Sequence, residues 1–203
     1  MIGAEVASFQ LAGVAAARYG VSWLAAHQLG LTIAWLAFVA PLDISQAAAI
    51  RVAEVHARAG GRASRRTGAV AIGLAVFVAS ATALVLLLAP GPLVRLFVEV
   101  GPTEDQAASV LEHGRAVLGV AACFQVFDGA QVVAAGALRG LRDTRVPSLI
   151  GVTCYGLVAP LAAWFAAVPL GLGVVGIWIG LAAVLALVAV ALVHRFLVVT
   201  ASR

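Results

Sequence analysis

With 63% hydrophobic and only 11% charged residues, this 203-residue chain is too apolar for a soluble domain, because soluble domains have about 45–50% apolar and about 25% charged residues. Its apolar runs are continuous and do not alternate with polar residues, which also excludes a membrane-spanning barrel. The net charge of +4 does not indicate nucleic-acid binding, because the arginines lie in short loops between apolar runs and form no single basic face.

Six apolar runs follow one another along the chain. A bilayer core about 30 Å thick requires roughly 20 apolar residues per helix. The runs lie at residues 2–17, 23–50, 68–89, 116–137, 146–168 and 172–199. We therefore predict an all-α, polytopic membrane protein in which residues 1–203 form a single bundle of six transmembrane helices.

The first run is the weakest of the six. Its roughly 16 residues before Arg18 would extend about 24 Å as an α-helix, and no basic residue precedes them. We expect the chain to begin within, or just before, a helix that belongs to a longer protein. A complete but short or tilted first helix is the alternative.

Prolines and glycines mark irregular positions inside the runs. Pro41 lies in the middle of the second run and Pro160 in the middle of the fifth, and a proline frees a backbone carbonyl and bends a helix. Four glycines form two pairs with a spacing of four residues: Gly136 with Gly140, and Gly176 with Gly180. Such spacing allows close helix approach, but with 21 glycines in the chain it also arises by chance, and we give it little weight.

The arginines predict the orientation of the bundle, because cytoplasmic loops are enriched in basic residues. All 13 basic residues are arginines, and ten of them lie in the second loop, the fourth loop and the C-terminal tail. Only Arg18, Arg95 and Arg115 lie on the other side. With six spans, both termini are then expected in the cytoplasm.

Asp128 is the strongest candidate functional residue, because an ionisable side chain inside a membrane is costly and typically marks an ion or substrate pathway. Gln125 and Gln131 lie three residues before and after it, so the three polar side chains share one helix face. Phe124 lies one turn before Asp128, where its ring could contact a bound cation. A buried carboxylate hydrogen-bonded to a neighbouring helix is the structural alternative.

Two further carboxylates lie within the runs. Glu5 either belongs to a polar stripe of the first run or is hydrated near the helix end. Asp43 either adds a charge to a polar cavity, with Gln28, Gln125 and Gln131 as further lining residues, or bonds backbone groups freed by the nearby proline; we favour the structural role. His27, at the start of the second run, is more often a satisfied polar group than a proton relay.

The sequence lacks the motifs of an enzyme. It has no Gly-rich phosphate loop, no set of His and Cys with metal-ligand spacing and no nucleophile–base arrangement. Cys123 and Cys154 lie in apolar runs, where cysteine behaves as a small hydrophobic residue. We therefore expect no enzymatic activity, no cofactor and no metal beyond a coupling ion, because Asp128 could exchange a proton or bind Na⁺ when ionised.

Three parts of the chain resemble the multidrug and toxic compound extrusion (MATE) transporters. Ala25-Ala26-His27-Gln28, with residues 38–41, 45–47 and 50–52, resembles the eighth helix of that family. The run QVFDGAQ at 125–131, continuing through GALRGLRDTRVP at 136–147, resembles its tenth helix and the loop that follows. GIWIG at 176–180 resembles the start of its last helix. The matches occur in the family's order, and the block 128–147 is fairly specific.

The resemblance implies the C-terminal lobe, helices seven to twelve, of a twelve-helix antiporter in the plasma (inner) membrane of a bacterium. Such an antiporter uses inward movement of Na⁺ or H⁺ to export bulky, often cationic, organic compounds. Members of the matching type bind the cation at acidic residues on helices seven and ten, the positions of Glu5 and Asp128, and Phe124 matches an aromatic position beside them. Asp43 departs from the pattern, because relatives generally carry a small or uncharged residue there.

Two other functions stay open at this point. A lipid-linked saccharide flippase of the same superfamily would be expected to line its cavity with several Arg or Lys, whereas the arginines here lie in loops. The chain could also be a truncated remnant that does not transport. One lobe alone would leave its cavity face open to membrane lipid, so we expect it to need the missing N-terminal lobe or a second copy as its partner.

Overall fold

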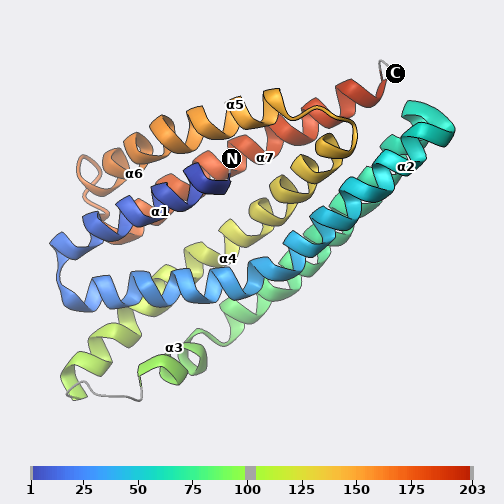
Figure 1. Cartoon of the computed structure of the whole chain (residues 1–203). Helices are drawn as coiled ribbons and strands as arrows, with labels where there is room; N and C mark the ends of the chain where they lie inside the picture. The colour runs from blue at the N-terminus through green and yellow to red at the C-terminus, as the bar shows by residue number, and fades with distance from the viewer. Residues whose placement is uncertain (1, 99–103, 202–203) are drawn as a thin grey trace.

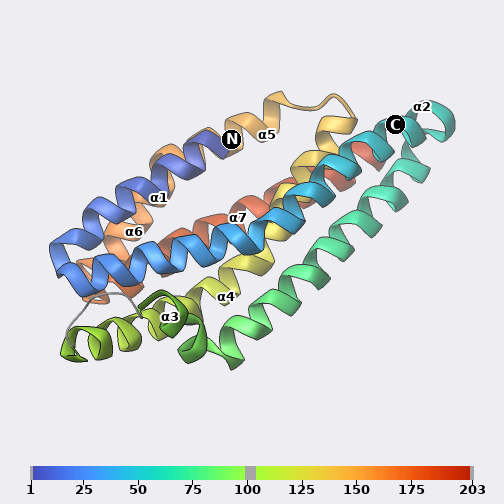
Figure 2. The ribbon, with the colours of Figure 1, turned by 60° about the horizontal axis from the view of Figure 1, so that its bottom comes forward.

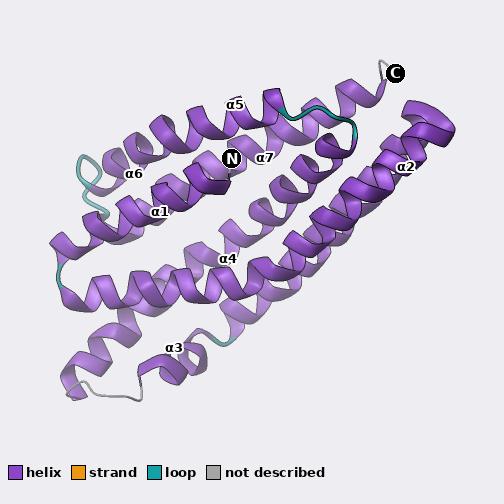
Figure 3. Cartoon of the chain, viewed as in Figure 1, coloured by secondary structure: helices purple, strands orange, loops and turns teal. Residues whose placement is uncertain are grey.

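The computed structural model describes residues 2–98 and 104–201, which form helices joined by short loops and contain no strand (Figure 3). The elements are α1 (Ile2–Ala16), the 3₁₀ turn η1 (Ala17–Tyr19), α2 (Val21–Leu88), α3 (Pro90–Val98), α4 (Glu104–Gly140), α5 (Arg145–Thr153), the π-helical turn η2 (Cys154–Val158), α6 (Ala159–Ala167) and α7 (Gly173–Ala201). Four described segments are long and apolar enough to cross a membrane: Val21–Leu88, Ala108–Gly140, Arg145–Ala167 and Gly173–Ala201. The predicted all-α membrane fold is confirmed.

The 68-residue segment α2 is a hairpin of two helical arms, residues 21–59 and 61–88, which meet at Gly60 (Figure 2). Gly60 has φ 74° and ψ −166°, a conformation that residues with a Cβ rarely adopt. The hydroxyl of Ser64 donates to the Gly60 carbonyl at 2.8 Å and stabilises this reversal. The second and third apolar runs of the sequence therefore lie on the two arms of one segment.

The helices extend further than the apolar runs. Residues 51–67, expected as a loop, are helical except at Gly60, and α4 begins at Glu104, well before residue 116. These extra turns are rich in Ala, Arg and Glu, which favour helix without being apolar, whereas hydropathy detects only the part of a helix suited to lipid. The first apolar run lies on α1, whose 15 residues extend about 22 Å, less than the thickness of a bilayer core.

The two prolines inside the runs have different effects. The first arm of α2 stays helical through Pro41. Before Pro160, by contrast, the backbone forms the π turn η2, in which the amide of Ala159 donates to the carbonyl of Cys154. The irregularity predicted for the fifth run is therefore one wide helical turn, which ends two residues before Pro160, the residue that has no amide hydrogen.

Both glycine pairs lie where two helices touch. A Cβ at Gly136 of α4 would overlap Ser45 on the first arm of α2. A Cβ at Gly180 of α7 would lie 2.5 Å from the amide nitrogen of Ala163 on α6. The other glycine of each pair, Gly140 or Gly176, is similarly close to the facing backbone. The two glycine pairs, to which the sequence alone gives little weight, therefore lie at the contacts of α4 with α2 and of α7 with α6.

Large apolar side chains cover much of the outside of the bundle. Phe77, Leu88 and Leu149 are 72%, 76% and 68% exposed. Monomeric soluble proteins rarely expose continuous apolar surfaces of this kind. The outer surface therefore suits contact with membrane lipid.

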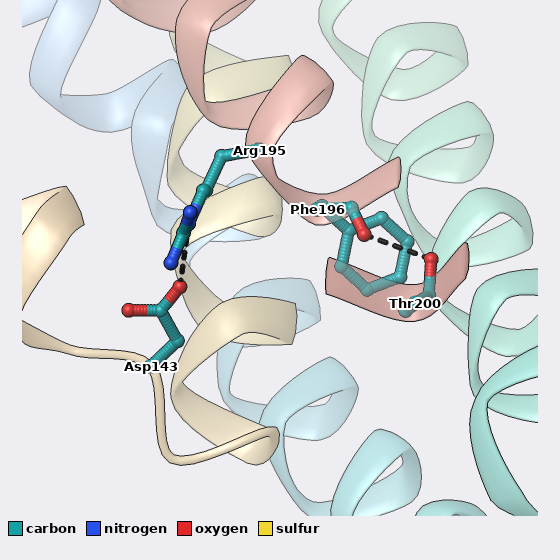
Figure 4. A network of polar contacts seen from close by, with 4 residues as sticks. All are labelled: Asp143, Arg195, Phe196 and Thr200. Carbon is teal, nitrogen blue, oxygen red and sulfur yellow. Dashed lines mark hydrogen bonds and ion pairs between the residues drawn. The ribbon is translucent and has the colours of Figure 1, made fainter. Parts of the chain in front are cut away.

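The arginine-rich segments gather at one end of the bundle, where the tip of α2, the α4–α5 loop and the end of α7 lie together (Figure 1). Here Nε of Arg195 on α7 pairs with Oδ2 of Asp143 in the α4–α5 loop at 2.8 Å (Figure 4). The neighbouring Phe196 ring lies against Gly68 on the second arm of α2. Arg203, which the sequence also places at this end, lies outside the described residues. This end of α7 is thus joined to both neighbouring segments.

Candidate functional site

Two carboxylates from distant parts of the chain meet inside the bundle. Glu5 on α1 and Asp128 on α4 are 7% and 4% exposed, and both line one cavity of about 40 Å³. One water molecule needs roughly 10–15 Å³ of such space, so the cavity suits a few waters or a small cation and not a drug-sized compound. Its other lining residues are Val6, Phe9, Leu31, Ala34, Trp35, Phe38 and Phe124.

Glu5 is held by a chain of hydrogen bonds between buried side chains. Nε2 of Gln131 donates to Oε2 of Glu5 at 3.2 Å. The hydroxyl of Tyr155 donates to Oε1 of Gln131 at 2.7 Å. Because Gln131 lies three residues after Asp128, one face of α4 carries both the second carboxylate and the donor to the first, as the spacing predicts.

Two buried acceptor oxygens on α4, one of them at the cavity, have no hydrogen-bond donor in the part of the chain that the structure describes. Oδ1 of Asp128 and Oε1 of Gln125 are buried and have no hydrogen-bond partner among the described residues. The ion pairs found in that part of the chain involve neither Glu5 nor Asp128. Buried acceptors without a donor are costly, and a proton or a cation would satisfy them.

The oxygen atoms around this cavity are suited to bind a hard cation. Carboxylate and amide oxygens are the ligands that such cations prefer. Across residues 2–98 and 104–201, no group of three or more His, Cys, Asp or Glu is placed to hold a metal ion. A cation here would therefore be held by the two carboxylates, with amide oxygens or water completing its shell.

Aromatic rings form one wall of the cavity. The Phe124 ring meets Phe9 edge-on with centroids 5.3 Å apart, and lies 6.2 Å from Trp178 on α7. Phe124 thus lines the cavity, as its position one turn before Asp128 predicts. Nε1 of Trp178 donates to Nδ1 of His27 at 3.1 Å, whereas the buried Nε2 of His27 has no hydrogen-bond partner among the described residues, so a purely structural role for this histidine stays a prediction.

The other polar residues singled out from the sequence lie elsewhere. Asp43 and Gln28 are exposed on the first arm of α2 and do not line this cavity. Gln125 is buried, and its Nε2 donates across to the Ala34 carbonyl of α2 at 3.4 Å. A role for Asp43 and Gln28 in a second, larger cavity stays a prediction.

Tyr155 is the residue of this site that the sequence does not single out. It lies in the fifth apolar run with no polar residue three or four positions away. The nearest signal is Pro160, which predicts an irregular helix but not which side chain that irregularity positions.

Comparison with known proteins gives concordant matches. The model of the MatE family matches residues 4–164. The multidrug resistance protein NorM of Burkholderia vietnamiensis is 43% identical over 202 residues, which cover 98% of this chain and 43% of that protein. A probable multidrug resistance protein NorM of Pseudomonas putida is 40% identical over 192 residues, 95% of this chain and 41% of that protein. This chain therefore spans less than half the length of these relatives.

A solved structure of a MOP superfamily transporter from Pyrococcus furiosus has the same fold. It matches with a TM-score of 0.71 at 19% sequence identity, over 95% of this chain and 41% of the other. At this level of identity the likeness concerns the fold alone.

Proposed function

The chain belongs to the MatE family, a family of transporters and not of enzymes, and on that premise we propose that it is one lobe of a cation-coupled exporter of organic, often cationic, compounds. The observation that carries the proposal is the burial of Glu5 and Asp128 around one small cavity in which an oxygen of Asp128 has no donor. We assign cation binding to these two residues, with Phe124 beside them.

The arrangement explains how a cation could be coupled to a change of shape. Two ionised carboxylates around a small cavity repel each other when no counter-charge lies between them. Na⁺ between them, or a proton on one of them, offsets that repulsion and favours close contact of α1 with α4. Binding and release of the ion would then favour two different arrangements of the lobe, which is what coupling requires.

The exported compound would bind outside the carboxylate cavity, which is too small to hold it. Because the chain spans less than half the length of its relatives, we propose that it works with a second lobe, either the N-terminal lobe or a second copy. The drug cavity would lie between the lobes, with the exposed Asp43 and Gln28 as candidate lining residues. The arginine-rich end would face the cytoplasm.

Drug efflux in membrane vesicles tests this proposal. The chain is expressed alone and with the N-terminal half of a NorM relative, and export of a cationic dye is followed under imposed Na⁺ and H⁺ gradients. We expect gradient-driven export that Asp128→Asn abolishes. Glu112→Gln, which changes an exposed carboxylate of the same helix, is the control and should transport normally.

Coupled export that survives Asp128→Asn would refute the assignment of the site. Absence of gradient-driven export in both preparations would favour the remnant that does not transport. The flippase alternative is the less consistent one, because the named relatives are multidrug resistance proteins.

A further inference from the structure

Tyr155 is held through both its backbone and its hydroxyl, and it is 2% exposed. The Ser8 hydroxyl of α1 donates to the Tyr155 carbonyl, and the Tyr155 hydroxyl donates to Oε1 of Gln131 on α4 at 2.7 Å. Gln131 in turn donates to Glu5 on α1. Tyr155 therefore joins η2 to both helices that carry the carboxylates.

The π turn keeps Tyr155 on the buried face of its helix. Buried residues along this helix recur at intervals of four: Pro147, Gly151, Tyr155, Ala159 and Ala163. In a regular α-helix each four-residue step rotates about 40° beyond a full turn, so such a stripe would leave the buried side. A π turn is wider and rotates less per residue. The turn before Pro160 thus keeps the phenol directed at α4.

The direction of these hydrogen bonds fixes the Gln131 amide. An ionised Glu5 only accepts hydrogen bonds, so the amide presents Nε2, its donor end, to Glu5 and Oε1 to the Tyr155 hydroxyl, which donates. With the amide reversed, two acceptors would face each other. Without the hydroxyl, the buried Oε1 loses its donor, and the reversed orientation becomes accessible. The Tyr155 hydroxyl therefore stabilises the amide orientation in which Glu5 meets a donor.

We propose that Tyr155 is a positioning residue of the cation site, which acts through Gln131 to orient the Glu5 carboxylate. This inference rests on the proposed function, because it concerns the same site. Gln131 engages Oε2 of Glu5 and leaves its other oxygen available to a cation in the cavity. Loss of the Tyr155 hydroxyl keeps both carboxylates but frees Glu5 to rotate, so cation binding weakens while the fold persists.

Sodium binding by the purified chain in detergent tests the inference. The probe is the rise in the thermal unfolding midpoint with NaCl, measured at constant ionic strength against choline chloride. We expect Tyr155→Phe to raise the Na⁺ concentration that gives half-maximal stabilisation about tenfold, with little change of the midpoint in choline chloride alone. Tyr19→Phe removes the hydroxyl of the exposed second tyrosine and should behave as the wild type.

A double-mutant cycle separates positioning from general packing. Gln131→Leu should weaken Na⁺ binding at least as much as Tyr155→Phe, and the double variant should be no weaker than Gln131→Leu alone. Additive effects, or an unchanged Na⁺ requirement in Tyr155→Phe, would overturn the inference.

The proposed function and the inference fail in different ways. Stabilisation by Na⁺ that is abolished by Asp128→Asn but untouched by Tyr155→Phe refutes the inference and leaves the function standing. A wild-type chain that Na⁺ does not stabilise also overturns the inference. The proposed export function would then be tested separately, by dye export under an H⁺ gradient.

Discussion

Asp128 and Asp143 lie on, or just after, the same helix but have opposite surroundings. Asp143 pairs with Arg195 at 2.8 Å at the arginine-rich end of the bundle. Asp128 is buried within α4, one of its oxygens has no partner, and neither ion pair of the described residues involves it. A carboxylate with a permanent counter-charge fastens two segments, whereas one without it is free to bind and release an exchangeable ion. The two residues thus separate a structural acid from a candidate functional one.

The largest expected effect of removing one of these two acids is on Na⁺ binding, when Asp128 is replaced. Asp128→Asn should weaken Na⁺ binding about 100-fold or more, because it removes one of the two charges that attract the ion. The free energy of unfolding should stay equal or rise, because a buried charge without a counter-charge destabilises a fold. Na⁺ titration and chemical denaturation measure the two effects. A variant that unfolds more readily than the wild type would show that Asp128 is structural after all.

A smaller effect, on stability alone, is expected at Asp143. Asp143→Asn should lower the free energy of unfolding by about 1 kcal/mol. Arg195 is partly exposed, so its ion pair with Asp143 contributes more than a surface pair and less than a buried one. Na⁺ binding should be unchanged. Arg195→Gln is the matched variant, and combining the two should add little to either. Weakened Na⁺ binding in Asp143→Asn would mean that the two acids are not independent.

The smallest effect is the response to ionic strength. Raising choline chloride from about 0.05 M to about 0.5 M should reduce the stability difference between the wild type and Asp143→Asn by a few tenths of a kcal/mol, because a partly exposed pair is screened. The Na⁺ affinity of the buried site should change less. Equal responses would indicate that the cavity is more open to solvent than its burial implies.

The polar face of α4 could be predicted from the sequence because helical spacing is a local property. Positions 125, 128 and 131 had to share a side, and Gln131 does donate to Glu5 across to α1. What spacing could not predict is the partner of each side chain. Gln125 turns to the Ala34 carbonyl of α2, because that contact depends on how two helices pack.

The arms of α2 and the role of Tyr155 are two features that the sequence patterns do not predict. Hydropathy marks the lipid-suited part of a helix and misses polar turns, so the long helical hairpin at Gly60 was expected as a loop. Pro160 predicts an irregular backbone nearby, but the bond from the Tyr155 phenol to Gln131 depends on how another helix packs against this one.

The position of α7 has a mechanical consequence. Trp178 bonds His27 on α2, and Arg195 pairs with Asp143 after α4; these contacts lie about 25 Å apart along the helix. A rod fastened at two such distant points cannot slide or turn without breaking one of them. Glu5 instead joins α1 to Gln131 of α4 at the carboxylate cavity, and Ser8, one turn further along α1, joins it to Tyr155 of η2. On the proposed function, a change of charge at Glu5 would act directly on the attachment of α1. On the proposed function, α7 would be the stationary frame of this lobe, and α1 would be the element that an arriving ion locks or releases.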